Sequence, residues 1–310
     1  MVKSKNGSHS FMVLLSGAST IMTRRNVLKS IMPNRAIIWI NNLKEIFLIK
    51  SIHAAIQEQG LSQLMNKLET IVPDITHQYS TFEIYSDYYK AKVRGQHTFQ
   101  IHLVNKALKL ISGVNDNFLI VDIGDSAGTH ICYLRSIHNN QNTKFLSVNI
   151  DEMAVNKIRK KGLEAICCRA EDLSSYSLNA DIFLSFEMLE HLMNPAQFLY
   201  DLSTKTNCKA LVITVPYVIN SRLGLYHIRN QERKNVTPEN THIFELSPNN
   251  WKLLFMHSGW SVAYEKIYLQ YPTKSPLRLM KWFWKKYDFE GFYGVVLLRD
   301  NSWSKLYDGW

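Results

Sequence analysis

The sequence predicts an α/β protein built on a parallel, doubly wound sheet. Strand-like apolar runs alternate with helix-like segments between residues 118 and 215, a glycine turn follows the first of these strands, and two more strand-like runs lie near the C-terminus. Ligands bind such sheets at the carboxyl ends of the strands, where the strand order reverses. The loops at those ends are therefore the first candidates for a functional site.

The N-terminal part, residues 1–85, is expected to be a leader followed by a helical extension. Its apolar run Phe11–Met22 superficially imitates a signal peptide, but it is short and interrupted by small polar residues, so we interpret it as a poorly ordered or amphipathic leader. Apolar spacing over residues 35–69 predicts two helices joined near Gly60, and residues 73–82 read as a loop. No stretch reaches the roughly 18 apolar residues of a membrane span.

The main domain is expected over residues 86–300, and its elements follow in a regular order. A helix over Asp87–Ile111, closed by Gly113, leads into a strand, Phe118–Ile123, and a turn, Gly124–Gly128. The helices expected after that turn begin near Thr129 and cover Glu152–Lys161 and Pro195–Thr204, and the strands expected between them are Lys144–Ile150, Leu163–Cys168, Asp181–Phe186 and Lys209–Val215.

The C-terminal third differs in character. Residues 217–240 are polar, basic and too long for a plain connection, which makes them a candidate lid or acceptor loop. A helix is expected over Pro248–His257, and two late strands, Trp260–Leu269 and Phe292–Leu298, complete a seven-stranded sheet as a hairpin. Residues 301–310 form a tail.

Charge and cysteine content narrow the class of protein. The net charge of +10 favours polyanions, anionic lipid surfaces or acidic substrates, but the charge is dispersed and no polybasic tail exists. The four cysteines include no C-x-x-C pair, so neither a zinc knuckle nor a redox motif is supported. Reduced, buried thiols in a soluble, cytoplasmic protein fit this pattern best.

The turn after the first strand carries the first functional signal. A dinucleotide site needs G-x-G-x-x-G with an acid about 20 residues later, whereas this chain has Asp122-x-Gly124-x-x-x-Gly128. The spacing resembles motif I of the class I S-adenosylmethionine (SAM) methyltransferases, D-x-G-x-G-x-G, with Ser126 at the middle glycine. An ordinary turn without a ligand remains the alternative for this stretch taken alone.

A second motif strengthens the resemblance. Residues 181–195, DIFLSFEMLEHLMNP, closely resemble the fourth-strand signature of the same family, and Thr241–Pro248 and Gly259–Trp260 follow in the family's order. The resemblance spans about residues 90–270. Within it, the sequence resembles the type 11 and type 12 methyltransferases. It implies a Rossmann-like doubly wound sheet, mostly parallel with a C-terminal antiparallel hairpin, and SAM as the cofactor.

The resemblance also implies which residues bind the cofactor. Asn149 stands where the family places an acid on the ribose, and an amide oxygen still accepts a hydrogen bond from a ribose hydroxyl. Asp151 either assists or simply caps the next helix, and the acidic turn after the third strand either contacts adenine or is solvated. The implied cofactor residues are Asp122, Gly124, Asp125, Ser126, Gly128, Asn149, Ile150, Asp151, Ala170, Glu171, Asp172, Glu187 and Met188.

Glu187, Glu190 and His191 have the spacing of one face of a helical turn. Some O-methyltransferases resemble this pattern and hold Mg²⁺ there together with a later histidine, which His242 matches. A metal would lower the pKa of an acceptor hydroxyl. Other members carry the same run without a metal, and we favour that interpretation, with His191 or His242 as the general base.

The acceptor is predicted from segments outside the core motifs. Residues 221–229, 239–244 and 285–292 resemble methyltransferases of bacterial surface-glycan and O-antigen gene clusters, which implies O-methylation of a sugar hydroxyl in glycan biosynthesis. The alternatives are a small-molecule or RNA O-methyltransferase and a SAM-binding fold without catalysis. Expected partners are a glycan or other hydroxyl acceptor and, peripherally, the membrane or glycan-assembly enzymes; no specific nucleic acid is expected. The aromatic residues 282–284 either stack on an acceptor or belong to the core.

Overall fold

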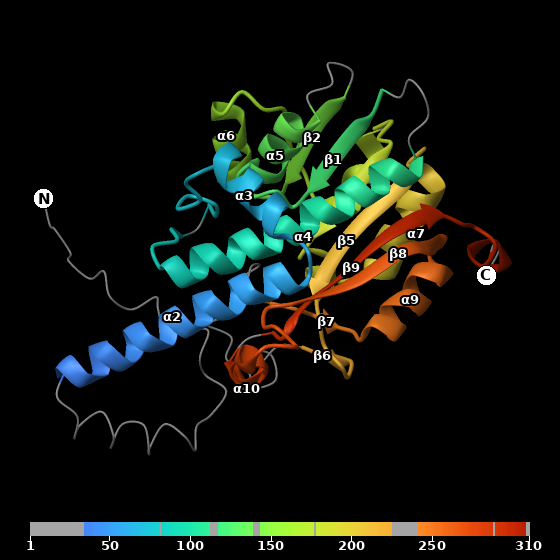
Figure 1. Cartoon of the computed structure of the whole chain (residues 1–310). Helices are drawn as coiled ribbons and strands as arrows, with labels where there is room; N and C mark the ends of the chain where they lie inside the picture. Colours follow the sequence, from blue (N-terminus) through green and yellow to red (C-terminus); the bar gives the residue numbers. More distant parts are fainter. Residues whose placement is uncertain are drawn as a thin grey trace, which may run out of the picture.

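The computed structural model describes residues 34–80, 82–111, 117–138, 143–176, 178–224, 241–287 and 289–307. A seven-stranded sheet lies at its centre, with the strand order β3-β2-β1-β4-β5-β9-β8 (Figure 1). Its strands are β1 (Leu119–Ile123), β2 (Lys144–Asn149), β3 (Ala165–Cys167), β4 (Ile182–Phe186), β5 (Ala210–Pro216), β8 (Trp260–Leu269) and β9 (Gly291–Arg299).

Strand pairing confirms the predicted fold class. β1 pairs in parallel with β2 on one side and β4 on the other, and β5 continues the parallel part next to β4. β9 is inserted antiparallel between β5 and β8, so the two late strands form the predicted hairpin. The chain therefore runs outward from β1 in one direction and then, from β4, in the other, and the carboxyl ends of β1 and β4 flank the point of reversal.

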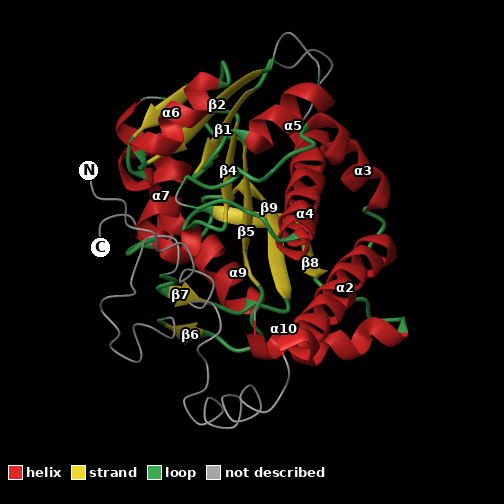
Figure 2. Ribbon diagram, turned by 90° about the vertical axis from the view of Figure 1, so that its left-hand side faces the viewer, coloured by secondary structure: helices red, strands yellow, loops and turns green. Residues whose placement is uncertain are grey.

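Helices cover both faces of the sheet (Figure 2). α2 to α5 pack on one face, with α6 beside α5, and α7 and α9 pack on the other. Their bounds are α2 (Asn34–Glu58), α3 (Ser62–Ile71), α4 (Asp87–Ile111), α5 (Thr129–Ile137), α6 (Glu152–Lys160), α7 (Pro195–Lys205) and α9 (Pro248–His257). The predicted break between the first two helices is confirmed at Gly60, whose φ of 73° ends α2.

Each face has its own apolar core. On the α4 side, Phe99 and Leu103 pack against β9 at Gly294, where an added Cβ would lie 2.4 Å from a Leu103 methyl group. On the other side, Trp251 of α9 and Trp260 of β8 are fully buried, and the Trp260 indole N–H donates to the Leu199 carbonyl at 2.9 Å. These two cores pack on opposite faces of the sheet and hold the loops at its carboxyl edge in place.

Several smaller elements lie outside the predicted pattern. They are the 3₁₀ helices η2 (Ala170–Tyr176), η3 (Leu189–His191), η5 (Pro276–Met280) and η6 (Ser304–Tyr307), the helix α10 (Lys281–Tyr287) and a two-stranded sheet of β6 (Arg222–Leu223) and β7 (Phe244–Glu245). The leader over residues 1–33, Gly113 and most of the expected lid, residues 225–240, lie outside the described residues.

Two further expectations can be compared with the structure. All four cysteines are unpaired, and the prediction that they are buried is confirmed only for Cys208. Cys132 and Cys168 are half-buried, and Cys167 is exposed at the sheet edge in β3. Among the described residues, no helix combines the length and the hydropathy that a membrane crossing needs.

Candidate functional site

The turn between β1 and α5 depends on its two glycines. Gly124 has a φ of 93° and Gly128 a φ of 72°, a region that residues with a Cβ rarely enter. A Cβ on Gly128 would lie 2.6 Å from a methyl group of Leu163, so α5 can approach the neighbouring layer only with glycine there. A Cβ on Gly124 would instead point at the Met188 side chain, 3.4 Å away.

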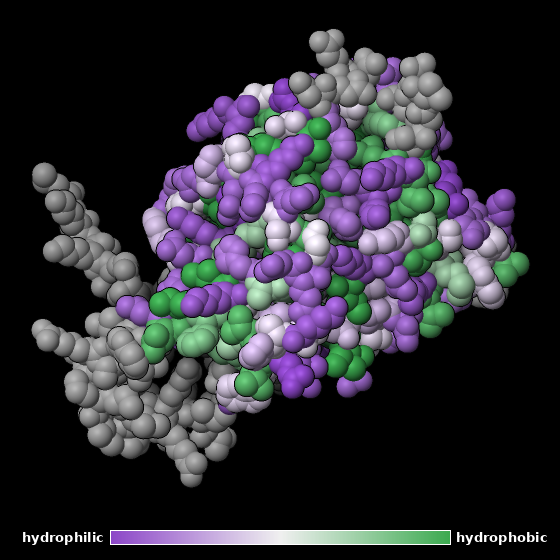
Figure 3. Space-filling model, in the orientation of Figure 1, coloured by the Kyte–Doolittle hydropathy of each residue, from purple (hydrophilic) through white to green (hydrophobic). Residues whose placement is uncertain are grey.

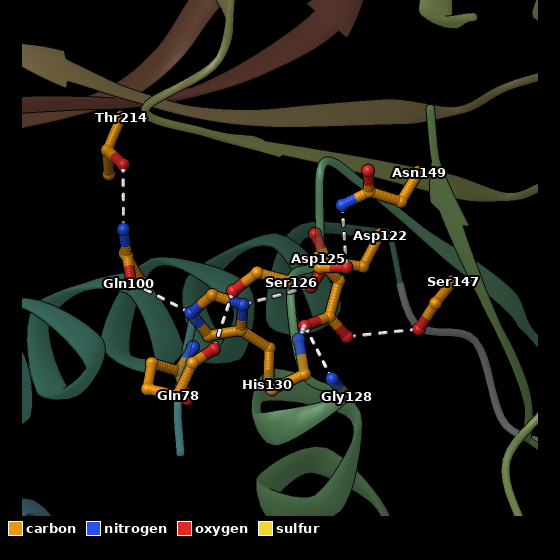
Figure 4. Close-up of polar contacts among 11 residues, drawn as sticks. Gln78, Gln100, Asp122, Asp125, Ser126, Gly128, His130, Ser147, Asn149 and Thr214 are labelled. Carbon is orange, nitrogen blue, oxygen red and sulfur yellow. Dashed lines mark hydrogen bonds and ion pairs between the residues drawn. The ribbon is translucent and has the colours of Figure 1, made fainter. Parts of the chain in front are cut away.

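Asp125 holds this turn from inside. One carboxylate oxygen accepts hydrogen bonds from the backbone N–H groups of Ala127 at 3.2 Å and Gly128 at 2.8 Å, and the other accepts from the Ser147 hydroxyl at 3.0 Å (Figure 4). Asp125 is buried, so the structure shows it shaping the turn. Ser126, which replaces the family's middle glycine, donates to the Gln78 carbonyl at 2.8 Å and ties the N-terminal extension to the turn.

Asp122 begins a buried hydrogen-bonded chain that crosses to β5 (Figure 4). Its carboxylate lies 3.0 Å from His130 Nδ1, His130 Nε2 lies 2.9 Å from Gln100 Oε1, and Gln100 Nε2 donates to the Thr214 hydroxyl at 3.1 Å. Since both ring nitrogens of His130 face oxygen atoms, this arrangement suits the protonated imidazolium. The Asp122 side chain thus has a fixed orientation beside the glycine turn.

The pKa values of this pair follow from burial and mutual attraction. Burial raises the pKa of Asp122 to about 6, against the pull of the His130 charge. Burial alone would lower the pKa of His130, but the Asp122 carboxylate outweighs it and the net shift is upward. The pair therefore shares a proton between two buried groups that stabilise each other's charged form.

The predicted ribose and adenine residues lie along the carboxyl ends of β2 and β3. The Asn149 amide donates to the Asp125 carbonyl at 3.1 Å and accepts from the Asp151 N–H at 2.7 Å, so it joins β2 to the glycine turn. Asp151 caps α6 by accepting from the Met153 N–H at 2.9 Å, and Ile150 is exposed beside it. Of the two readings for Asp151, the structure therefore shows the cap.

Three more predicted residues begin the 3₁₀ helix η2 after β3. Ala170 and Glu171 are half-buried, and Glu171 forms an ion pair with Arg169 at 3.1 Å. Asp172 is exposed, with its backbone N–H bonded to the Arg169 carbonyl at 3.2 Å. The Asp172 carboxylate is accordingly open to solvent at the sheet's carboxyl edge.

The loop after β4 faces the glycine turn across the point of reversal. Glu187 has a φ of 51°, which is uncommon for a residue with a Cβ, and its backbone N–H donates to the Thr214 carbonyl at 2.9 Å. This left-handed residue stops β4 and turns Met188 toward Gly124. The predicted single helical face is not formed, because Glu187 lies outside the 3₁₀ turn that contains Glu190 and His191.

Glu190, His191 and His242 converge behind this loop. Each offers a ligand atom, and these atoms lie within 4.8 Å of one another; Glu187 is not in the group. His191 and His242 meet edge to face with ring centroids 4.7 Å apart, and His242 Nδ1 lies 3.4 Å from a carboxylate oxygen of Glu245. His191 Nδ1 lies 2.9 Å from the Thr241 carbonyl, so it is the donor, and the lone pair of a neutral His191 resides on Nε2.

The carboxylate of Glu190 is fully buried, and within the described part of the chain neither of its oxygens has a hydrogen-bond partner. His191 Nε2 lies 3.9 Å from one of them. Burial raises the pKa of Glu190 well above its usual range, helped by the nearby carboxylates of Glu187 and Glu245. Burial also raises the pKa of Glu187 to about 8. Such a buried acid either stays protonated or pairs with a cation.

Replacement of Glu190 by Gln is expected to make stability less sensitive to pH. The carboxyl ionises near its usual pKa of 4.5 in the unfolded chain but only at higher pH in the fold. Between these two pKa values the unfolded state binds fewer protons, so the free energy of unfolding falls by about 1.4 kcal/mol per pH unit for one such group as pH rises. Because Gln cannot ionise, the variant does not undergo this decrease in the free energy of unfolding.

Urea unfolding at about pH 5 and about pH 8, with a chelator present, measures the effect. The wild type should lose more stability than Glu190→Gln between the two conditions. Glu164→Gln, on an exposed carboxylate, is a matched control and should follow the wild type. An equally steep loss in Glu190→Gln would contradict the assignment.

Some residues of the site could not be found from sequence motifs. His130 and Gln100 are fully or nearly buried polar residues on apolar helix faces, and only that mismatch with their neighbours could have marked them. Glu245 is buried beneath Arg222 and His242, and its position in β7 gave no separate signal. Gln78 lies in the segment that was expected to be a plain loop.

No protein-family model and no curated protein matches this sequence. Solved structures of similar fold include SAM-dependent methyltransferases and a [4+2]-cyclase. A 1,6-didemethyltoxoflavin-N1-methyltransferase from Burkholderia thailandensis, solved with S-adenosylhomocysteine (SAH), is 12% identical with a TM-score of 0.46, over 69% of this chain and 86% of that chain. A SAM-dependent methyltransferase from Mesorhizobium loti is 12% identical with a TM-score of 0.43, over 63% of this chain and 96% of that chain. The N-terminal domain of EvdMO1, solved with SAH, is 10% identical with a TM-score of 0.44, over 77% and 96% of the two chains.

Proposed function

We propose that this protein is a SAM-dependent O-methyltransferase that acts on a sugar hydroxyl of a glycan intermediate. The observation that carries the proposal is the pairing of Gly124 with Met188 across the point of strand reversal. Gly124 leaves bare backbone at the end of β1, in a conformation that other residues rarely adopt, and Met188 faces it from the loop after β4. Both belong to the motifs that resemble the SAM methyltransferases.

The residues around this point suit the parts of SAM. Bare backbone at Gly124 leaves room for the methionine end of SAM to lie against the turn. The amide of Asn149 and the open carboxylate of Asp172 lie along the edge that the ribose and adenine would follow. SAM supplies a methyl group activated by a sulfonium, so the protein's task is to align an acceptor with it and to exclude water.

An alcohol acceptor must also lose its proton. His191 is held by the Thr241 carbonyl so that Nε2 is its basic nitrogen, and His242 is oriented by Glu245. A neutral imidazole can take up that proton. Phe289 stacks on His242 with ring centroids 5.4 Å apart and offers an apolar wall of the kind that packs against sugar rings.

The side chains of Glu190, His191 and His242 also fit a divalent cation. Glu190 supplies a buried carboxylate without a partner in the described chain, and His191 and His242 supply imidazole nitrogens. A set of one oxygen and two nitrogen donors suits Mn²⁺ or Zn²⁺ better than Mg²⁺, which prefers oxygen ligands and water. Such an ion would hold the acceptor oxygen and lower its pKa, with the histidines as ligands instead of bases.

Transfer of a labelled methyl group from SAM tests the proposal. The purified protein, with and without a chelator, is incubated with nucleotide sugars, glycan fractions and RNA, and the label is located by hydrolysis. Label in an O-methyl sugar is the expected result. Label in RNA would show that the acceptor is RNA and not a glycan. SAM binding without transfer to any hydroxyl would overturn the enzyme assignment.

A further inference from the structure

Large apolar side chains are exposed on α10 and on the 3₁₀ helix η5 that runs into it. Leu279 is 79% exposed and Trp282 is 64% exposed, and a patch of adjacent exposed apolar side chains marks a candidate interaction site. They lie three positions apart and share one side of the segment. Figures 1 and 2 place α10 beside α2 and near β6 and β7.

This exposure is not the result of poor packing. The opposite side of the same segment is anchored in the core: Trp284 is fully buried, and its indole N–H donates to the Ser51 hydroxyl of α2 at 3.4 Å. Phe283 packs beneath the ammonium of Lys44, 4.8 Å from its ring centroid. The helix has therefore already buried one apolar side and presents a second one outward.

Cations surround the two exposed apolar residues. Residues 275–287 contain four basic residues and no acidic one. All four basic side chains are exposed, and Lys286 lies over the Trp282 ring at 4.8 Å from its centroid. We call this the α10 surface, made of Arg278, Leu279, Lys281, Trp282, Lys285 and Lys286.

The acidic side chains next to the α10 surface do not neutralise its positive charge. Lys281 approaches Glu290 at 3.9 Å, and Glu290 is buried and accepts a hydrogen bond from the Tyr271 hydroxyl at 2.8 Å. Glu58 of α2 accepts hydrogen bonds from the backbone N–H groups of Thr273 and Lys274. Within residues 275–287 themselves, every charged side chain is basic.

A second apolar strip continues the α10 surface along α2. Phe47 and Ile46 are 48% and 46% exposed, and Phe47 lies one turn from Lys44, which contacts Phe283. Figure 3 shows apolar side chains among polar ones along this lower edge of the molecule. The exposed apolar groups thus extend over two packed helices.

We infer that the α10 surface docks on an anionic lipid bilayer. Trp and Leu insert at the level of the headgroups, where an aromatic ring with a polar edge is most stable. Lys and Arg side chains on both sides reach the lipid phosphates, and their long stems lie along the apolar residues. An apolar pair within a ring of cations is the pattern of peripheral membrane binding.

The location of this surface gives it a consequence for the acceptor, and this part rests on the proposed function. The chain leaves α10 and reaches Phe289, which stacks on His242 of the candidate site. Docking through α10 would therefore hold that site at the bilayer, where a lipid-linked glycan presents its sugars. The docking itself needs neither SAM nor methyl transfer.

Sedimentation with lipid vesicles tests the inference on the full chain. Vesicles of phosphatidylcholine alone are compared with vesicles that also contain phosphatidylglycerol, at low and high salt. We expect binding to the anionic vesicles only, reduced by salt. The double variant Leu279→Ala/Trp282→Ala should lose at least about tenfold in partitioning.

The matched control is Trp303→Ala/Leu306→Ala. These residues have the same types and the same spacing, with Trp303 just before η6 and Leu306 within it, and are 45% and 60% exposed. The control should bind vesicles as the wild type does, and an unchanged thermal midpoint shows that both variants fold. Equal loss in both double variants, or no binding to anionic vesicles, would overturn the inference. So would a dimer that only Leu279→Ala/Trp282→Ala abolishes, because the surface would then join two copies. Methyl transfer to a soluble acceptor is unaffected by any of these outcomes.

Discussion

Gly124→Leu is expected to abolish SAM binding in a protein that still folds. The Cβ of any residue at position 124 would point at Met188, and a leucine side chain would fill the space between the β1 turn and the β4 loop. The nearest atom to that Cβ is 3.4 Å away, so the substitution does not break the core. The positive φ costs about 1–2 kcal/mol, and we expect SAM affinity to fall by at least about 100-fold.

Gly162→Leu separates backbone strain from loss of the site. Gly162 has a φ of 71°, follows α6, and has nothing within 4 Å of an added Cβ. The two variants should lose similar stability in urea, whereas Gly162→Leu should bind SAM as the wild type does. Tight SAM binding by Gly124→Leu would show that the cofactor does not lie against this turn.

His191→Gln is expected to lower kcat by about 100-fold or more without changing SAM affinity. His191 is the imidazole whose Nδ1 faces the Thr241 carbonyl, which leaves Nε2 as the basic atom next to Glu190. Removal of a general base costs about 10²–10⁴ in rate. A variant that also loses the acid limb of the pH–rate profile identifies the base, whereas one rescued by added Mn²⁺ identifies a metal ligand.

His257→Gln is the control for a histidine outside the site. His257 lies in α9 and packs against Tyr307, with ring centroids 5.5 Å apart. Its replacement should leave kcat unchanged. A His191→Gln enzyme that keeps more than about one tenth of the wild-type kcat would exclude both roles for His191.

The sequence predicted the sheet well because its signals are local. The alternation of strands and helices, the glycines of the β1 turn and the break at Gly60 each depend on a few adjacent residues. The predicted hairpin of β8 and β9 also formed, since both strands are long and bounded by turns. Glycine positions in particular report backbone conformation directly.

The internal contacts of the site could not be predicted in the same way. The Gln100 to Thr214 bond joins residues 114 positions apart, and nothing near either residue indicates the other. Asp125 and Asn149, which are expected to bind the cofactor, also make internal contacts that no local pattern indicates: the Asn149 amide donates to the Asp125 carbonyl and the Ser147 hydroxyl to the Asp125 carboxylate. The left-handed Glu187 displaced that residue from the helical face on which spacing had placed it.

Titration calorimetry with SAM and SAH tests the central claim most directly. The wild-type protein, shown to be folded by a cooperative urea transition, should bind both molecules at a single site, and both should lose affinity in Gly124→Leu but not in Gly162→Leu. A folded protein that binds neither SAM nor SAH would contradict the assignment of the β1 turn and the β4 loop as a SAM site.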